Sequence, residues 1–161
     1  MLKKYNMSYN NKIGWRFDNT YSKLLGSMLA RLAPTPVKAP ELVVLNHSLS
    51  KMLELDFSST SDKNLASIFS GNLLPEGSDT IAQAYAGHQF GYFTMLGDGR
   101  AALSPMLREY IVSETMHSLG IPTTRSLSVV KTGENVIRET PLKKGTTSAI
   151  SANTSSTSYN F

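Results

Sequence analysis

The chain has 161 residues, of which 40% are hydrophobic and 9% aromatic, with a net charge of +4 and no cysteine. This composition is typical of one soluble globular domain, and the lack of cysteine excludes disulfides, a thiol nucleophile and cysteine-ligated zinc. No apolar run approaches the roughly 18 residues of a membrane span and no leader pattern opens the chain, so we expect a cytoplasmic protein without a membrane partner.

The basic excess lies at the two ends of the chain. Residues 13–142 contain 11 of the Lys and Arg residues and all 12 Asp and Glu residues, which leaves a net charge of −1. A nucleic-acid surface needs a basic stripe with interleaved aromatic residues, and the sequence has no such pattern. We therefore expect no nucleic-acid partner.

The N-terminal part of the chain predicts extended structure. Residues 1–12 are polar and rich in Asn, which predicts a flexible terminus. Three prolines within 34–40 favour an extended segment, because each fixes its own φ and disfavours helix at the residue before it. A short strand is then predicted over 41–45.

A first helix is predicted over 47–54. Asn46 can cap it, and its apolar residues fall on one face: Leu49, Met52 and Leu53. The stretch 56–64 is rich in Ser, Asp and Asn, which predicts a loop.

A second helix is predicted over 104–119. Ser104 offers an N-cap, Pro105 suits the first helical position and Gly120 provides the stop. Apolar residues recur along it at three- and four-residue spacing and predict a buried stripe: Leu103, Met106, Leu107, Tyr110 and Ile111.

The C-terminal part predicts a hairpin and then irregular chain. Two β-rich runs, RSLSVV and NVIRE, are separated by KTGE, which predicts a hairpin over 125–139. Nine of the sixteen residues from 146 to 161 are Ser or Thr, and none is charged. No helical or strand period survives there, so we expect a disordered tail over 146–161.

A glycine turn, Gly97-Asp98-Gly99-Arg100, precedes the second predicted helix. Glycines let backbone N–H groups approach an anion, and an arginine makes a forked contact to phosphate oxygens. The pattern lacks the third glycine of a dinucleotide fingerprint and the GK[ST] of a Walker loop. From the residues alone, a structural turn is favoured over a nucleotide loop.

No other catalytic or metal-binding constellation emerges from the residues. His47, His88 and His117 lack metal-ligand spacing. Glu109 and Glu114 are five residues apart on the predicted helix, so they do not share a face, and solvated carboxylates are the preferred interpretation.

Three long strings carry a family resemblance. AYAGHQFGYFTMLGDGR, IVSETMHSLGIPTTRSLSVVKTGE and VIRETPLK resemble the selenoprotein O (SelO) family of kinase-fold protein adenylyltransferases, over about Trp15 to Lys143. The resemblance implies an α+β fold, namely part of a kinase-like N-terminal lobe with a small antiparallel sheet, an αC-type helix and an N-terminal extension. The implied divisions are a flexible 1–12, an incomplete lobe over 13–145 and the tail.

The resemblance also implies an activity and its residues. The family transfers AMP from ATP to Ser, Thr or Tyr hydroxyls, so ATP and Mg²⁺ are the expected cofactors and proteins the expected substrates. Gly97, Asp98, Gly99 and Arg100 match nucleotide-contacting positions. Glu109 matches the helix glutamate that pairs with a phosphate-holding lysine.

This sequence departs from the family pattern at two places. The family carries two GDGRA copies, separated by strands and the lysine motif, whereas here one copy joins both flanks. We therefore predict a deletion that removes the lysine, so that Glu109 turns to solvent or pairs with Arg100 or Arg108. After Lys143 the resemblance is expected to end in a frameshifted tail, without the family's catalytic loop and metal ligands.

Three functional hypotheses follow from these departures. The first is an inactive fragment of an adenylyltransferase. The second is a module that still binds a nucleotide or a partner without catalysis. The third is a non-enzymatic interaction fragment with strand edges left exposed by the missing strands.

Overall fold

The computed structural model describes residues 13–24, 26, 29–83, 101–135, 147–155 and 158–159. Its elements in chain order are η1 (Tyr21–Lys23), β1 (Leu29–Arg31), β2 (Glu41–Leu45), α1 (His47–Met52), α2 (Asp62–Phe69), β3 (Ile81–Gln83), β4 (Ala101–Ala102), α3 (Leu103–Ser118), β5 (Arg125–Asn135), β6 (Thr147–Ser155) and β7 (Ser158–Tyr159). This mixture confirms the predicted α+β class. The expected flexible N-terminus, 1–12, lies outside the described residues.

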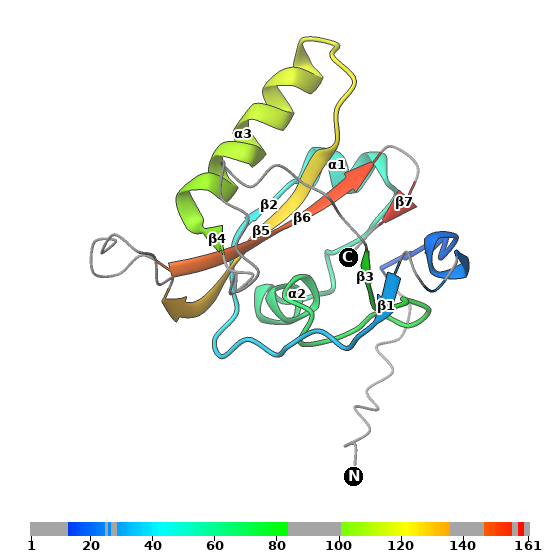
Figure 1. Ribbon diagram of the computed structural model, residues 1–161. Coiled ribbons are helices and arrows are strands. Elements are labelled where there is room, and N and C mark those ends of the chain that lie inside the picture. The colour runs from blue at the N-terminus through cyan, green and yellow to red at the C-terminus, as the bar shows by residue number, and fades with distance from the viewer. Residues whose placement is uncertain are drawn as a thin grey trace, which may run out of the picture.

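Five strands form one antiparallel sheet in the spatial order β2-β5-β6-β4, with β7 paired to β6. β1 and β3 form a separate antiparallel pair. Figure 1 shows α3 above the larger sheet and α2 below it. β5 has a strand on each side, and its residues from Arg125 to Val130 are all buried. It is therefore a central strand of the larger sheet, next to β6.

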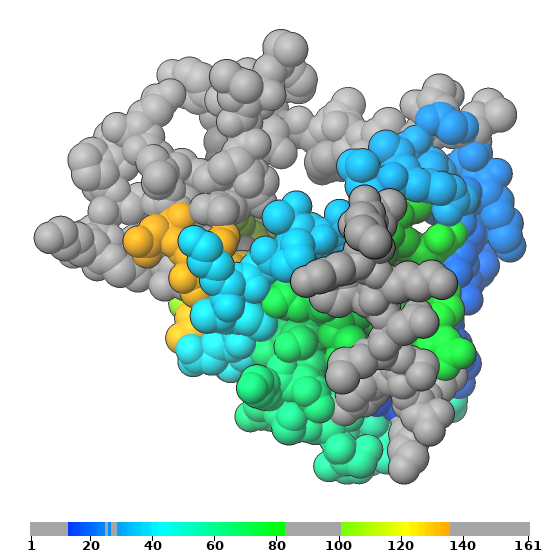
Figure 2. Space-filling model, turned by 90° about the horizontal axis from the view of Figure 1, so that it is seen from below, coloured from blue at the N-terminus to red at the C-terminus, as the bar shows by residue number. Residues whose placement is uncertain are grey.

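The main core lies between this sheet and the two helices α1 and α2. The Trp15 ring stacks on Phe17 at 5.6 Å and meets the Phe57 and Phe69 rings edge-on at 5.7 and 6.2 Å. Burying a large apolar side chain contributes about 1.5–3 kcal/mol, so this cluster ties the N-terminal segment to α2. On the face seen in Figure 2, the blue and cyan chain lies beside the green α2–β3 region.

The predicted strand over 41–45 is confirmed as β2, and the predicted cap of the next helix is confirmed in atomic detail. The Asn46 Oδ1 atom accepts a hydrogen bond from the Leu49 N–H at 2.9 Å. The helix ends at Met52, earlier than the predicted end at 54, because Glu54 adopts φ +57 and redirects the chain. Leu49 is buried, but Met52 is 59% exposed, so the predicted apolar face is only partly buried.

The predicted loop over 56–64 is wrong at its C-terminal end, because α2 begins at Asp62. The Ser61 hydroxyl caps it by accepting from the Asn64 N–H at 3.4 Å. Its buried residues share the face against the core: Leu65, Ala66, Ile68 and Phe69. The first turn of α2 is polar and has the composition of a loop, so the sequence pattern did not predict where this helix begins.

The second predicted helix is confirmed as α3, with a different N-terminus and a different burial. The residue at its N-cap is Ala102 rather than Ser104. At the other end, the Gly120 N–H donates to the His117 carbonyl and the Ile121 N–H to the Met116 carbonyl, both at 3.0 Å, which closes the helix in a Schellman motif. No residue of α3 is fully buried, so the predicted buried stripe is confirmed only in part: its residues are half-buried except for the exposed Ile111.

The predicted hairpin over 125–139 is also wrong. Residues 131–134, expected as its turn, belong to the continuous strand β5, whose register shifts between Lys131 and Asn135. Gly133, at φ +73, lies at this irregularity. A glycine inside a β-rich run thus marks a bulge here rather than a turn. The expected return strand falls mostly outside the described residues.

The tail differs most from its expectation. Residues 147–155 form β6, which pairs along β5, and residues 158–159 form β7. The disorder predicted for 146–161 is therefore wrong for these residues. A strand ladder is made by backbone groups, so a run of Ser and Thr can join one without charge or an apolar period.

Candidate functional site

The predicted phosphate loop, Gly97, Asp98, Gly99 and Arg100, lies outside the described residues. The chain that follows it directly is β4 and then α3. α3 begins at Leu103 without a side-chain cap and without an acidic residue in its first turn. The described part of the candidate site is therefore α3 and the strand beneath it, β5.

Glu109 lies on the exposed side of α3. Among the described residues, no ion pair includes it, and Arg108 beside it is likewise exposed. The pairing with Arg100 that the sequence suggested involves a residue outside the described ranges. Glu109 is thus presented to solvent at this part of the surface.

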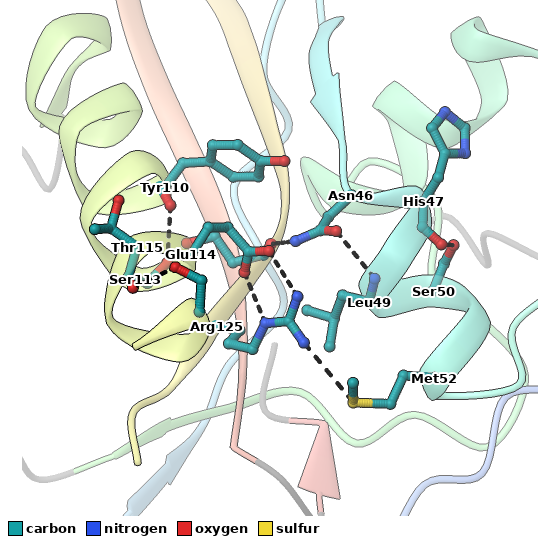
Figure 3. Close-up of polar contacts among 12 residues, drawn as sticks. Asn46, His47, Leu49, Ser50, Met52, Tyr110, Ser113, Glu114, Thr115 and Arg125 are labelled. Atoms are coloured by element: carbon teal, nitrogen blue, oxygen red, sulfur yellow. Dashed lines mark hydrogen bonds and ion pairs between the residues drawn. The ribbon is translucent and has the colours of Figure 1, made fainter. Parts of the chain in front are cut away.

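The second acidic residue of α3, Glu114, forms a two-pronged ion pair with Arg125 at the start of β5. Arg125 Nε donates to Glu114 Oε1 at 2.7 Å, and Arg125 Nη2 donates to Glu114 Oε2 at 2.6 Å. The Arg125 side chain is 7% exposed and that of Glu114 25%. Figure 3 shows both side chains meeting between α3 and β5. This fork is the strongest class of charge-assisted hydrogen bond in proteins.

The pair shapes the electrostatics of this side of α3. The hydrogen bond from Arg125 lowers the pKa of Glu114, although partial burial opposes the shift. The same bond raises the pKa of Arg125. Burial first, and then the Glu114 charge, raise the pKa of the nearby Tyr110 hydroxyl. At neutral pH the site therefore holds one carboxylate and one guanidinium.

Asn46 and Met52 complete the surroundings of Arg125. Arg125 Nη1 contacts the Met52 sulfur at 3.7 Å. Asn46 Nδ2 donates to the Ser126 carbonyl at 3.2 Å, and a side-chain hydrogen bond with Asn46 also lowers the pKa of Glu114. Residues of α1, α3 and β5 thus converge at one point, visible in Figure 3.

Sequence reasoning missed this cluster. Glu114 was predicted to be a solvated carboxylate, and it is instead half-buried and paired with Arg125. The one available signal was an arginine just before the β-rich run that follows the helix, at a separation of 11 residues from Glu114. The residues between Glu114 and Arg125 include a turn whose geometry the sequence does not define. The sequence alone therefore does not predict this contact.

Within the described ranges, no three His, Asp or Glu side chains lie close enough together to hold a metal ion. His47 and His117 belong to those ranges, whereas His88 does not. Among these residues, no helix has both the length and the apolar character that crossing a membrane requires.

Comparison with known proteins identifies relatives of this chain among the protein nucleotidyltransferases. The chain is 52% identical to the protein nucleotidyltransferase YdiU of Pelagibacter ubique, over 79% of the chain and 33% of that protein. It is 49% identical to the YdiU proteins of Nitrosococcus oceani and Anoxybacillus flavithermus, over 81% and 80% of the chain and 34% of each protein. The chain thus spans about a third of the length of these curated relatives, which are protein nucleotidyltransferases.

The family model described as Protein adenylyltransferase SelO matches residues 12–104 and 93–159. The chain belongs to the SelO family. The second match extends to residue 159, contrary to the expectation that the resemblance ends at Lys143 in an out-of-frame tail.

The two matched ranges overlap at residues 93–104, which contain the single Gly97–Arg100 turn. An overlap of this kind is what the predicted deletion between two similar repeats would produce. The alignment with the Pelagibacter protein contains positions that this chain does not match. Its 161 positions take in 79% of this chain, about 127 residues, so about 34 positions of the relative have no counterpart here.

Proposed function

We propose that this chain is the nucleotide-handling, kinase-like N-terminal part of an ATP-dependent protein adenylyltransferase, and that it does not transfer AMP by itself. The observation that carries the proposal is the double family match at 93–104. It supports both the family activity, AMP transfer to protein hydroxyls, and the loss of the segment in which the phosphate-holding lysine is expected.

The residues present suit nucleotide contact better than chemistry. Gly97 and Gly99 allow backbone N–H groups to approach phosphate oxygens, and Arg100 adds a forked charge. Nucleotidyl transfer further requires the phosphates to be neutralised and the acceptor hydroxyl to be oriented by groups that act together. Glu109 is exposed and has no ion-pair partner among the described residues. We therefore assign it no catalytic step in this chain.

ATP and Mg²⁺ remain expectations from the family. ATP would supply the AMP group and Mg²⁺ the neutralising charge. The described residues hold no cluster that fits a metal ion, so no ligand to Mg²⁺ is proposed among them.

Incubation with α-labelled ATP, Mg²⁺ and a generic protein acceptor tests the proposal. We expect no covalent label on the chain or on the acceptor. Label that appears with this chain and disappears in Arg100→Ala would contradict the proposal, because it would show transfer through the retained loop.

Nucleotide binding without transfer is tested by thermal melting with and without Mg-ATP. A ligand that binds only the folded state raises the midpoint, so we expect a rise with the parent chain. Arg100→Ala should abolish the rise, and Arg108→Ala, a matched control at an exposed arginine of α3, should preserve it. If Mg-ATP leaves the melting midpoint of the unsubstituted chain unchanged, the proposal that this chain binds a nucleotide is wrong.

A second candidate function, a protein-interaction fragment, is favoured by the surface around the end of α3. Large apolar side chains are exposed there, with Leu119 at 70% and Ile121 at 44% exposure. Exposed apolar groups gathered on one surface are typical of association sites. Sedimentation at increasing concentration tests this candidate: a mass that stays at the monomer value would rule out self-association.

A further inference from the structure

α3 is held against the sheet with little apolar burial. None of its residues is buried, whereas α2, half its length, buries four. The free energy from burial scales with the apolar area removed from water. Apolar packing therefore constrains the orientation of α3 less than it constrains that of α2. Hydrogen bonds and ion pairs, which depend on direction, have a larger share in orienting α3.

The most directional contact of α3 is the one between Glu114 and Arg125. Its two nearly parallel hydrogen bonds, at 2.7 and 2.6 Å, fix both the position and the angle of the carboxylate. The Arg125 guanidinium is 7% exposed and sits at the first residue of β5. Because the Arg125 guanidinium is buried, loss of the Glu114 counter-charge is strongly unfavourable, and this favours the paired position of Glu114.

Glu109 belongs to the same continuous helix. At about 100° and 1.5 Å per residue, it lies about 140° around the axis and about 7.5 Å along it from Glu114. A helix of 16 residues moves largely as a unit over one and a half turns. Fixing the Glu114 carboxylate on Arg125 therefore fixes the direction in which Glu109 points.

We propose that Glu114 and Arg125 are positioning residues: their ion pair sets the rotation of α3 on the sheet and thereby the place of Glu109. The inference rests on the proposed function, because only in an adenylyltransferase that retains the phosphate-holding lysine would the place of Glu109 give it a role. The rotation of the helix itself does not depend on that role. It can be measured without nucleotide.

The chain has no cysteine, so spin labels can be placed at chosen sites without background. We select Arg108→Cys, which reports the Glu109 end of α3, and Lys63→Cys on α2, since both side chains are exposed. Pulsed electron spin resonance on this labelled chain should give one narrow distance peak. In Glu114→Gln, which removes the charge with little change in shape, we expect the single narrow peak to be lost.

Glu109→Gln is the matched control, because it makes the same change on the same helix at an exposed residue without a described ion pair. It should keep the narrow peak. Glu114→Asp, which keeps the charge but shortens the reach, should give a shifted or broadened peak, and it also serves if Glu114→Gln does not fold. Melting curves of each variant identify those that are folded at the temperature of measurement.

A purely stabilising role would lower the melting midpoint of Glu114→Gln and leave the distance peak of the folded protein unchanged. That result would overturn the proposal. Thermal melting of the parent chain with Mg-ATP, described above, is a separate measurement. Failure of the parent to respond to ATP would contradict the proposed function and leave the distance result standing.

Discussion

The side-chain amide of Asn72 pairs with both backbone groups of Val37. Asn72 Oδ1 accepts from the Val37 N–H at 2.8 Å, and Asn72 Nδ2 donates to the Val37 carbonyl at 2.9 Å. At this residue of the Pro-rich segment, the side-chain amide makes the two hydrogen bonds that a neighbouring strand would otherwise make. It thereby fastens that segment to the loop that follows α2.

Asn72→Ala should lower the free energy of unfolding by about 2 kcal/mol, because it leaves two partly buried backbone groups without this partner. Urea denaturation measures the change. Asn19→Ala provides a comparison, since Asn19 donates one exposed bond to the Gly77 carbonyl, and its cost should be smaller. Equal costs for the two substitutions would show that the Asn72 pairing contributes no more to stability than one exposed hydrogen bond.

Gly133 and Gly120 have the same backbone conformation in different surroundings, with φ of +73 and +75. A Cβ at Gly133 would lie 2.6 Å from the Ala39 Cβ, whereas nothing lies within 4 Å of a Cβ at Gly120. Gly120→Ala should cost about 1 kcal/mol for the left-handed conformation. Gly133→Ala should cost about 1–3 kcal/mol more, because it overpacks the contact.

Chemical denaturation of both variants checks this difference. In the double variant Ala39→Gly with Gly133→Ala, we expect part of the added cost to be recovered, because the nearest clashing atom is removed. If the two alanine variants are equally stable, β5 does not approach Ala39 as closely as described.

The contribution of Glu114 to stability should depend on pH. Arg125 lowers the folded-state pKa of Glu114 below its usual value of 4.5, and His117 adds to the lowering. The stabilisation is therefore complete above the unfolded-state pKa and is lost as the pH falls through the lower folded-state value. At neutral pH, Glu114→Gln should be about 2 kcal/mol less stable than the parent.

The measurement is the difference in unfolding free energy between parent and Glu114→Gln from pH 7 to pH 3. The exposed carboxylates with lowered pKa, Glu54, Asp56 and Asp79, are present in both proteins and cancel in the difference. We expect the difference to shrink below about pH 4. A difference that stays constant over the range would mean that Glu114 is not ionised against Arg125.

The strand β6 should slow amide exchange in the tail. Ser151 pairs with Val129 and Ile150 with Val130, in the middle of the β5–β6 ladder. Backbone groups in a ladder exchange only when the ladder opens, so amides near Ile150 should exchange more slowly than the Ser58 amide, whose described hydrogen bond is to the exposed side chain of Asp56. Exchange at the rate of free chain throughout 147–155 would restore the sequence-based expectation of a disordered tail.

Signals that act over a few residues were predictable from the sequence. The Asn46 cap and the Gly120 stop were correct because each depends on contacts within about four positions of the residue. Glu54 shows the limit of this reasoning. It takes the left-handed conformation that usually calls for glycine, so the end of α1 carried no readable signal.

By itself the sequence determined the family, the α+β class, the Asn46 cap of α1 and the Gly120 stop of α3, because long motifs and short-range caps can be recognised without knowledge of the fold. The tertiary structure alone decided the partner of β5, the exposure of α3 and the pairing of Glu114 with Arg125. Strand partners and buried ion pairs depend on which distant segments share a surface. Neither the composition nor the hydrophobic period of a segment encodes which distant segment it will contact. The 16 residues at the C-terminus, which were predicted to be irregular, contain the strand β6 that pairs with the edge of β5.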